Sequence, residues 1–231
     1  MNGLFLALEG MDGAGKSSQI SLLAEYFHKI GKHVKTIHFP RLNQKPYGEM
    51  IAAYLRGEYG GMATVHPKLS ALLFALNRQQ SADEIRESVA NGRVVLADRY
   101  VLSNVAYQRA KIADIHAADE MAHWLESLEF GFLNVPRPDL TLFLDVPPEF
   151  SLSRLTADRK GEDREYLQGK EDIHEADALF QRRVRDEYLS LAKQNPGTMG
   201  RVDCGDAGGG MADKATIHSR VIDMLRYYKV I

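Results

Sequence analysis

The sequence predicts an α/β protein in which helices flank a mostly parallel five-stranded sheet, giving three layers. Five short apolar runs alternate with stretches of helical periodicity along the 231 residues. Strands that are joined by helices form parallel sheets covered on both faces. The length suits one domain of ordinary size, and 45% of the residues are hydrophobic. With no repeat or linker in the sequence, we expect residues 1–231 to form a single domain.

The first half of the chain is expected to supply three strands, each followed by a helical segment. Apolar runs predict strands over 4–8, 34–39 and 94–97. Helical patterns cover 16–30, 47–56 and a long stretch that opens at His66-Pro67, runs to about residue 90 and is stopped by Asn91-Gly92.

The second half continues the same alternation. Buried strands are expected over 140–146 and 201–204, with helical segments over 102–111 and 117–130 before them. Pro147-Pro148 is expected to start another helix, a helix of about twenty residues follows residue 170, and the last helix covers 213–229. Ligands of parallel α/β sheets bind beyond the carboxyl ends of the strands, so residues just after the strands are the candidates for function.

The residues that follow the first strand have the spacing G-x-x-x-x-G-K-S, from Gly10 to Ser17. In a strand–loop–helix context this is the phosphate-binding loop, and it predicts a P-loop NTPase fold. Backbone amides of the loop and the N-terminus of the next helix bind phosphate oxygens. The alternative is a glycine-rich turn before an ordinary helix. The candidate nucleotide-binding residues are Gly10, Met11, Asp12, Gly13, Ala14, Gly15, Lys16, Ser17 and Ser18.

Asp98 and Arg99 follow the apolar run Val-Val-Leu-Ala at the end of the third strand. Phosphate-loop enzymes place a magnesium-associated acid at this position, with the loop hydroxyl, here Ser17, as the other protein group near the metal. Asp98 is therefore either part of a Mg²⁺ site or a helix N-cap. Arg99 either pairs with a phosphate or carboxylate or forms a surface salt bridge.

Phe74 and Arg78 are four residues apart in a helical segment and so share one face. An aromatic ring beside a guanidinium suits a nucleobase. The alternative is a core phenylalanine with a surface arginine. Arg41, just past the second strand, is a further candidate for a phosphate contact.

Residues 158–170 are highly charged and include Arg159, Lys160, Arg164 and Lys170. This segment interrupts two helical patterns. It is either a solvated surface stretch or a lid that supplies arginines to a transferring phosphoryl group.

Composition excludes several classes of protein. The net charge is −2, with 29 basic and 31 acidic side chains, so we expect neither a nucleic-acid-binding nor a membrane-binding surface. The single cysteine, Cys204, excludes an internal disulfide and indicates a reducing compartment. No signal peptide or membrane-spanning run is evident, which predicts a cytoplasmic protein. The eight histidines lack zinc-site spacing.

Several segments taken together resemble the thymidylate kinase family over most of the chain. FLALEGMDGAGKSSQ (5–19) is similar to the family's phosphate loop, and DRYVLSNVAYQ (98–108) to its most diagnostic motif. The other matching segments are FPR (39–41), LLFALNR (72–78) and PDLTLFLDVPPE (138–149). The resemblance implies transfer of the ATP γ-phosphate to dTMP, giving dTDP and ADP, with Mg²⁺ as cofactor and a homodimeric assembly.

The resemblance also implies residue roles. Lys16 and Ser17 would serve ATP and Mg²⁺, and Asp12 would lie near the sugar 3′-hydroxyl and the acceptor phosphate. The implied catalytic residues are Lys16, Asp12, Arg99 and the lid arginines Arg159 and Arg164. The implied dTMP-binding residues are Asp12, Arg41, Phe74, Arg78, Arg99, Ser103, Asn104, Tyr107 and Gln108. Among them Phe74 would stack on thymine, Arg78 would hydrogen-bond it, and Tyr107 would pack under the deoxyribose.

Two positions refine the resemblance. Gly13 stands where some family members carry a catalytic arginine, which implies that the lid supplies it here. Leu42 stands where some carry an arginine, so the identity of the group that binds phosphate near Arg41 stays open.

Two other functions are considered: another deoxynucleoside or nucleoside monophosphate kinase, and a non-enzymatic nucleotide switch. The absence of an N-K-x-D motif argues against a GTP-specific switch.

Overall fold

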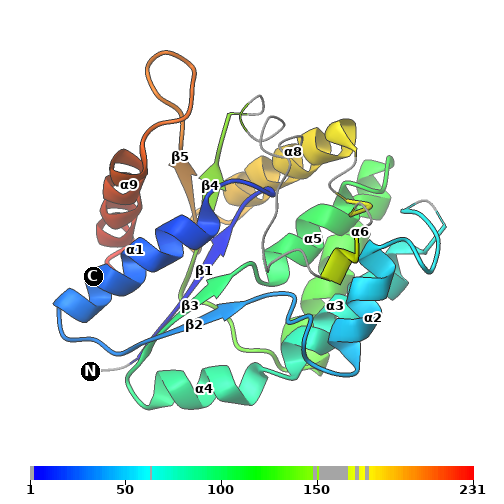
Figure 1. Ribbon diagram of the computed structural model, residues 1–231, viewed down its shortest axis with the longest axis horizontal. Coiled ribbons are helices and arrows are strands. Elements are labelled where there is room, and N and C mark those ends of the chain that lie inside the picture. The colour runs from blue at the N-terminus through cyan, green and yellow to red at the C-terminus, as the bar shows by residue number, and fades with distance from the viewer. Residues whose placement is uncertain (1–2, 63, 148–149, 151–165, 170–171, 175–176) are drawn as a thin grey trace.

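The computed structural model describes the whole chain except residues 1–2, 63, 148–149, 151–165, 170–171 and 175–176. Its centre is a five-stranded sheet in the order β2-β3-β1-β4-β5, in which every pair of neighbouring strands is parallel (Figure 1). The predicted α/β class is therefore confirmed. The strands are β1 (Leu4–Glu9), β2 (Val34–His38), β3 (Val94–Asp98), β4 (Leu140–Asp145) and β5 (Met199–Asp203).

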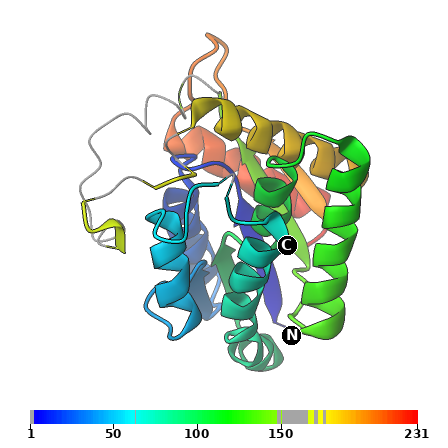
Figure 2. The same cartoon turned by 90° about the vertical axis from the view of Figure 1, so that its right-hand side faces the viewer.

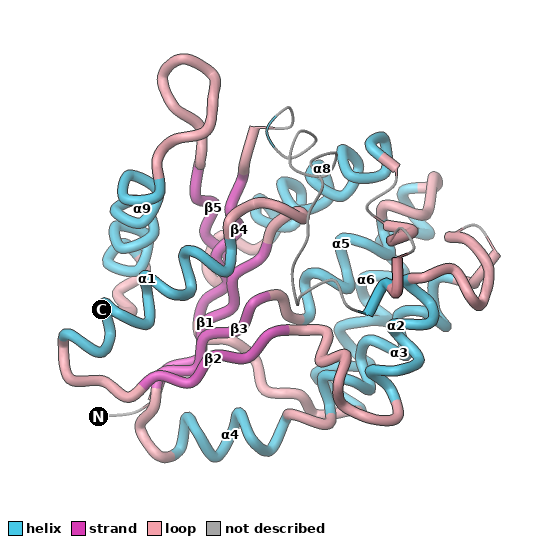
Figure 3. Tube along the Cα trace, in the orientation of Figure 1, coloured by secondary structure: helices cyan, strands magenta, loops and turns pink. Residues whose placement is uncertain are grey.

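Helices connect the strands and cover both faces of the sheet, as Figure 3 shows along the chain trace and Figure 2 shows from the side. The described helices are α1 (Lys16–Lys29), α2 (Tyr47–Leu55), α3 (Pro67–Gln79), α4 (Ala82–Ala90), α5 (Val101–Arg109), α6 (Ile115–Glu126), the π-helix η1 (Ser127–Phe132), α8 (Ala178–Gln194) and α9 (Lys214–Tyr227).

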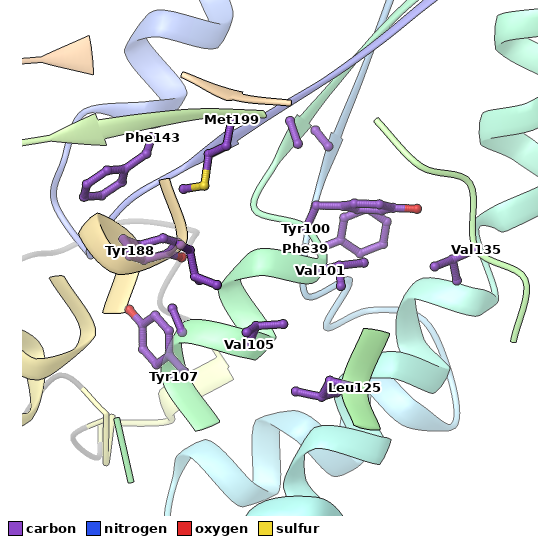
Figure 4. Close-up of a cluster of buried hydrophobic side chains, with 14 of the residues drawn as sticks. Phe39, Tyr100, Val101, Val105, Tyr107, Leu125, Val135, Phe143, Tyr188 and Met199 are labelled. Atoms are coloured by element: carbon purple, nitrogen blue, oxygen red, sulfur yellow. The ribbon is translucent and has the colours of Figure 1, made fainter. Parts of the chain in front are cut away.

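The two faces of the sheet are packed by alternate side chains of the same strands. In β1, Leu6 and Leu8 pack with α1 and α9, whereas Phe5 and Ala7 face the core formed with α4, α5 and α8. Both faces of the central strands are almost entirely apolar, because helices on each side shield them from solvent. Figure 4 shows the second core, where the ring of Phe143 on β4 is stacked on a tyrosine of α8 at a centroid distance of 4.9 Å.

The predicted long helix from His66 to about residue 90 is wrong, because the structure divides it into α3 and α4. The break falls at Gln80 and Ser81, where Ser81 donates its backbone N–H to the carbonyl of Arg78. Acidic residues in the first turn of α4 favour a new helix start at this place. The break matters for function because α3 then lies over the ligand cavity while α4 packs against β1 and β3.

Two further helical predictions differ in their bounds. The expected helix over 117–130 is α6 followed by η1, a π-helix that hydrophobic periodicity does not reveal. The helix expected directly after residue 170 begins only at residue 178, where Asp177 caps α8 by accepting the backbone N–H groups of Leu179 and Phe180. The helix expected after Pro147-Pro148 falls largely outside the described residues.

The carboxyl ends of all five strands lie at one edge of the sheet and carry polar residues. β1 ends in Glu9, β2 in His38, β3 in Asp98, β4 in Asp145 and β5 in Asp203. In the pairing of β1 with β3, Leu8 is opposite Asp98, so the loop after β1 lies next to the acid that ends β3.

Candidate active site

A cavity of about 1220 Å³ opens at this edge of the sheet. It is lined by the loop after β1, the ends of β2 and β3, helices α3 and α5, residues 211–217, and the side chains of Tyr166, Asp172 and His174. Single-ligand pockets usually measure about 300–1,000 Å³. The cavity therefore has room for more than one small ligand.

The loop from Gly10 to Ser17 has the conformation that its sequence predicts. Gly10 (φ 150°) and Gly15 (φ 81°) occupy the positive-φ region, and a Cβ at Gly10 would lie 3.0 Å from the carbonyl oxygen of Leu144. Gly15 directly precedes α1, which turns the helix N-terminus toward the loop. The backbone is thus shaped to present N–H groups to an anion.

Lys16 is buried within this loop and donates hydrogen bonds to the carbonyl oxygens of Gly10 (3.1 Å) and Met11 (2.9 Å). Burial and the neighbouring positive charge of Arg99 lower the pKa of Lys16 to about 8. Its hydrogen-bond partners in the structure are neutral carbonyl groups. A bound polyphosphate would give the Lys16 ammonium an anionic hydrogen-bond partner, whereas its partners in the structure are uncharged.

Ser17 and Asp98, the two residues predicted to lie near a metal, are hydrogen-bonded to each other. The hydroxyl of Ser17 donates to Asp98 Oδ2 at 3.0 Å, and His38 Nδ1 lies 3.3 Å from the same oxygen. Burial alone would raise the pKa of Asp98, but the hydrogen bond from His38 and the charges of Lys16 and Arg99 lower it to about 2. The other carboxylate oxygen, Oδ1, is buried and has no hydrogen-bond partner among the described residues.

This arrangement fits Mg²⁺. The ion commonly binds to kinases through one or two protein oxygens, substrate phosphates and water. A carboxylate that stays ionised and keeps one buried oxygen unsatisfied, beside a loop hydroxyl, supplies that donor set. Within the part of the chain that the structure describes, no cluster of three or more His, Cys, Asp or Glu side chains forms an all-protein metal site.

Asp12, Arg99 and Tyr107 form a second polar group, adjacent to the loop. Arg99 Nη2 donates to Asp12 Oδ1 at 2.6 Å, and the Tyr107 hydroxyl donates to Asp12 Oδ2 at 2.8 Å. The Arg99 guanidinium also lies 5.5 Å from the centre of the Tyr107 ring. Burial raises the pKa of Tyr107 well above its usual value, so its hydroxyl stays protonated as a donor.

The position of Arg99 depends on a buried carboxylate directly before the loop. Arg99 has a left-handed backbone (φ 64°), which is uncommon for a residue other than glycine. The next residues begin α5, whose first N–H groups, those of Tyr100 and Ser103, donate to Glu9 Oε1 at 2.9 and 3.0 Å. Glu9 is fully buried and acts as a helix cap supplied by another strand.

Phe74 and Arg78 of α3 both line the cavity, as their shared helical face predicts. Arg78 is buried and donates from Nε and Nη2 to the two carboxylate oxygens of Glu129 at 2.6 and 2.5 Å. Asn104 Nδ2 donates to Glu129 Oε1 at 3.0 Å. Glu129 lies in η1 and is fully buried.

The far wall of the cavity contains a buried histidine that the sequence did not single out. His174 packs its ring 5.4 Å from that of Tyr107, and its Nε2 lies 3.3 Å from the Tyr54 hydroxyl. Burial, together with the charge of Lys111, holds the pKa of His174 well below its usual range, so the ring is neutral. Burial also lowers the pKa of Lys111 to about 7.

The structure brings most of the predicted residues to this one cavity. Those that line it are Asp12, Gly13, Ala14, Gly15, Lys16, Ser17, Ser18, Phe74, Arg78, Asp98, Arg99, Ser103, Asn104, Tyr107 and Gln108. Gly10 and Met11 lie behind the lining, where their carbonyls bind Lys16. Arg159 and Arg164, with most of the lid expected over 158–170, lie outside the described residues.

Arg41 is the predicted phosphate contact that does not reach the cavity. Its Nη1 donates to Ser81 Oγ at 3.0 Å and to Glu84 Oε2 at 2.6 Å, while its backbone N–H donates to Asn77. The neighbours Pro40 and Leu42 line the cavity instead. Contact with an acceptor phosphate would require Arg41 to leave Glu84.

Sequence reasoning overlooked Glu9, Glu129 and His174. Glu9 carried a signal, because a carboxylate that ends an apolar strand is expensive to bury without partners. Glu129 and His174 carried none, since the first lies in a helical pattern and the second near the charged segment. Only the folded chain shows that both are buried beside the cavity.

Comparison with known proteins shows the family of this chain. The family model described as thymidylate kinase matches residues 8–206. The chain belongs to the thymidylate kinase family. It is 34% identical over 194 residues to the thymidylate kinase of Mycobacterium tuberculosis, covering 84% of this chain and 88% of that protein. It is 34% identical over 229 residues to the probable thymidylate kinase of Thermococcus kodakarensis, covering 96% and 97%.

Solved structures of thymidylate kinases have the same fold as this chain. The thymidylate kinase of Candida albicans, whose structure is described as revealing the origin of broad substrate specificity, superposes with a TM-score of 0.74 at 26% identity. That alignment covers 99% of this chain and 93% of the other. Among the described residues no helix combines the length and the apolar composition that crossing a membrane requires.

Proposed function

We propose that this protein transfers the γ-phosphate of ATP to dTMP, giving dTDP and ADP. The observation that carries the proposal is that one continuous cavity joins the phosphate loop to a niche made by an aromatic ring and a guanidinium. A phosphate loop alone indicates a nucleotide, whereas a second nucleotide site beside it indicates a phosphoryl acceptor.

ATP is assigned to the loop side of the cavity. Backbone N–H groups around Gly13 and Gly15 and the N-terminus of α1 would bind its phosphates. Lys16 would exchange its two carbonyl partners for phosphate oxygens and neutralise charge that builds up in the transition state. Ser17 and Asp98 would hold Mg²⁺, which supplies charge neutralisation and alignment of the phosphates when bound.

dTMP is assigned to the niche side. Phe74 would stack on the thymine, Arg78 would donate to its edge, and Asn104 would lie beside it. Tyr107 would pack under the deoxyribose, and Arg99, held against Asp12, would meet the acceptor phosphate. Ser103 and Gln108 complete the wall of α5.

The reaction is an in-line transfer without a covalent enzyme intermediate. An oxygen of the dTMP 5′-phosphate forms a bond to the γ-phosphorus, and the bond from that phosphorus to the β,γ-bridging oxygen breaks, so ADP leaves with the electron pair. The acceptor oxygen is already ionised, so no catalytic base is required. Positioning and charge neutralisation supply the catalysis, with Arg159 or Arg164 as the expected arginine from the lid.

An acceptor panel tests the proposal. ADP release should be measured with dTMP, dUMP, TMP, dCMP and thymidine under the same ATP and Mg²⁺ concentrations. The thymine methyl is worth about 1–3 kcal/mol, so dUMP should be a poor but real substrate. Preference for dCMP or for thymidine would favour the alternative, another kinase of the P-loop class. The broad substrate specificity ascribed to the Candida albicans enzyme makes this panel necessary.

We also infer a homodimer in the cytoplasm. Large apolar side chains are exposed on α3 and at the end of η1, where Leu69 is 65% and Phe132 is 85% exposed. Exposed apolar side chains that form a patch often mark a surface that another protein chain covers. Light scattering coupled to gel filtration tests this, and a monomer at micromolar concentration would contradict it.

A further inference from the structure

The part of the cavity around Phe74, Arg78 and Asn104, here called the base niche, contains a chain of hydrogen bonds. The group at each end of the chain fixes which atoms donate and which accept. At one end the buried carboxylate of Glu129 accepts from Arg78 and from Asn104. At the other end Lys111 Nζ donates to Gln108 Oε1 at 2.9 Å. The two amides of Asn104 and Gln108 lie between a carboxylate that accepts and an amino group that donates.

The orientation of Gln108 follows from its acceptor side. Its Oε1 receives the Lys111 ammonium and also the hydroxyl of Ser70 at 3.0 Å. If the amide were turned round, its N–H₂ group would face the amino group of Lys111, donor against donor when that lysine is protonated. Gln108 Nε2 therefore faces Asn104 Oδ1, at 3.3 Å.

The orientation of Asn104 follows from its donor side. Its Nδ2 donates to the carbonyl of Ala71 and to Glu129 Oε1, both at 3.0 Å, which uses both N–H groups of the amide. What remains for a ligand is a lone pair on Oδ1. Arg78, which gives two donors to Glu129, has three further N–H groups and no acceptor.

The wall of the cavity thus offers a donor from Arg78 and an acceptor from Asn104 side by side. Thymine and uracil carry the matching pair on one edge, the O4 acceptor and the N3–H donor. Cytosine carries the reverse, an N4 amino donor and an N3 acceptor, and so would meet donor against donor and acceptor against acceptor. A site built to hydrogen-bond its ligand rejects the mismatched one strongly, because buried polar groups lose their partners.

We propose that Glu129 and Lys111 are positioning residues that hold Asn104 and Gln108 in the orientation that selects thymine over cytosine. Neither residue lines the cavity, so each acts through the amides. The π-helical turn η1 makes this possible by carrying a carboxylate into the core beneath α3 and α5. The proposal rests on the proposed function, since it assumes that the base niche holds the acceptor.

The test compares Glu129→Gln with wild type, using dTMP and dCMP as acceptors. A glutamine has nearly the same shape but offers one acceptor oxygen in place of two, so it leaves a donor of Arg78 or Asn104 without its partner. The side chains that face the base then lose the support that fixes their orientation. The ratio of kcat/KM for dTMP to that for dCMP should fall at least about tenfold. KM for dTMP should rise by a similar factor while kcat stays within about threefold.

A matched control separates this effect from the loss of a buried ion pair. Arg109 is as buried as Arg78, and away from the lining of the cavity it donates from Nε to Glu187 at 2.5 Å and from Nη1 to Asp119 at 2.6 Å. Glu187→Gln should lower the melting temperature and leave the dTMP:dCMP ratio within about twofold. A folded Glu129→Gln protein that keeps its ratio within twofold, or a Glu187→Gln protein that loses it equally, overturns the proposal.

A second variant keeps the proposal testable if Glu129→Gln does not fold. Lys111→Met frees the Gln108 amide at the opposite end, and the ratio should fall at least about threefold. An unchanged ratio overturns the proposal. If the wild-type protein shows no dTMP-dependent ADP release, the proposed function fails. If the wild type prefers dTMP but the variants keep the wild-type dTMP:dCMP ratio, only this inference fails.

Discussion

The phosphate loop and the base niche lie in one cavity but are built in different ways. The loop uses consecutive residues, 10–17, and its binding groups are mostly backbone N–H groups at a helix start. The niche uses single side chains from α3, α5 and η1, which meet around the carboxylate of Glu129. A contiguous site can be identified in a sequence by its spacing, whereas a distributed site exists only after the elements have packed.

The two regions also treat their buried cations differently. Lys16 hydrogen-bonds to neutral carbonyls, and its pKa is lowered to about 8. Arg78 is neutralised by a bidentate bond to Glu129. The Lys16 ammonium thus has only carbonyl groups as hydrogen-bond partners and suits an anionic ligand, whereas the charge of Arg78 is neutralised, which suits an uncharged base. Burying a cation without an anionic partner is costly, so the difference is consistent with two different ligands.

The largest effect is expected for Lys16→Met, which changes the phosphate loop alone. The loop would lose its side-chain cation while the niche stays intact, so kcat should fall about 10³-fold and KM for dTMP should change less than about threefold. Steady-state kinetics with both substrates varied measures this. Equal losses on both sides would mean that the two regions do not act separately.

Phe74→Ala changes the base niche and leaves the phosphate loop intact. Stacking of a base on an aromatic ring is worth about 1–3 kcal/mol, so dTMP affinity should fall roughly 5- to 150-fold. ATP affinity should be unaffected. Isothermal titration calorimetry with each nucleotide measures both, and the thermal midpoint shows whether the packing of Phe74 against Tyr54, at a ring distance of 6.3 Å, matters for folding. Loss of ATP affinity would refute the separation.

The comparison is sharpened by pH. Because phosphate would raise the lowered pKa of Lys16, ATP should bind the protonated lysine more tightly than the neutral one. ATP affinity should be flat while pH stays below about 8, the pKa of Lys16 in the unliganded protein, and should fall up to about tenfold per pH unit above that value. dTMP affinity should stay flat between about pH 8 and 9, since the charge of Asp12 outweighs burial and holds the pKa of Arg99 above its usual value.

Proton uptake provides the check for that prediction. Calorimetry of ATP binding at about pH 8.5 in buffers of different ionisation enthalpy should show uptake of part of one proton. The uptake should vanish in Lys16→Met. Uptake that persists in the variant would assign the titration to another group.

The smallest change is Tyr107→Phe, which removes the hydroxyl that donates to Asp12 but keeps the ring. A single hydrogen bond contributes about 0.5–1.5 kcal/mol, so KM for dTMP should rise roughly two- to tenfold. Selectivity against the ribonucleotide TMP should persist, because the ring remains in place. Tyr107→Ala should relax that selectivity, and equal selectivity in both variants would remove Tyr107 from the sugar site.

Much of the fold and of the loop side could be predicted from the sequence. Apolar runs placed all five strands within a few residues. The central strands β1, β3 and β4 are buried along almost their whole length, whereas the edge strands β2 and β5 are only partly buried. The helix over 66–90 was mispredicted because its periodicity continues across Gln80 and Ser81, where tertiary packing divides it. Arg41 was expected at the acceptor phosphate but pairs with Glu84, a partner 43 residues away that spacing does not reveal.

By itself the sequence determined the strand–loop–helix that binds phosphate, because glycines at fixed spacing restrict the local backbone to few conformations. It also determined that Asp98 would follow a buried strand and that Phe74 would share a helical face with Arg78. Only the tertiary structure decided that Glu129, from a π-helical turn, meets Arg78 and Asn104, and that His174 closes the wall beside Tyr107. Those contacts join segments distant in sequence, and their free energy arises from burial, which exists only once the core has formed.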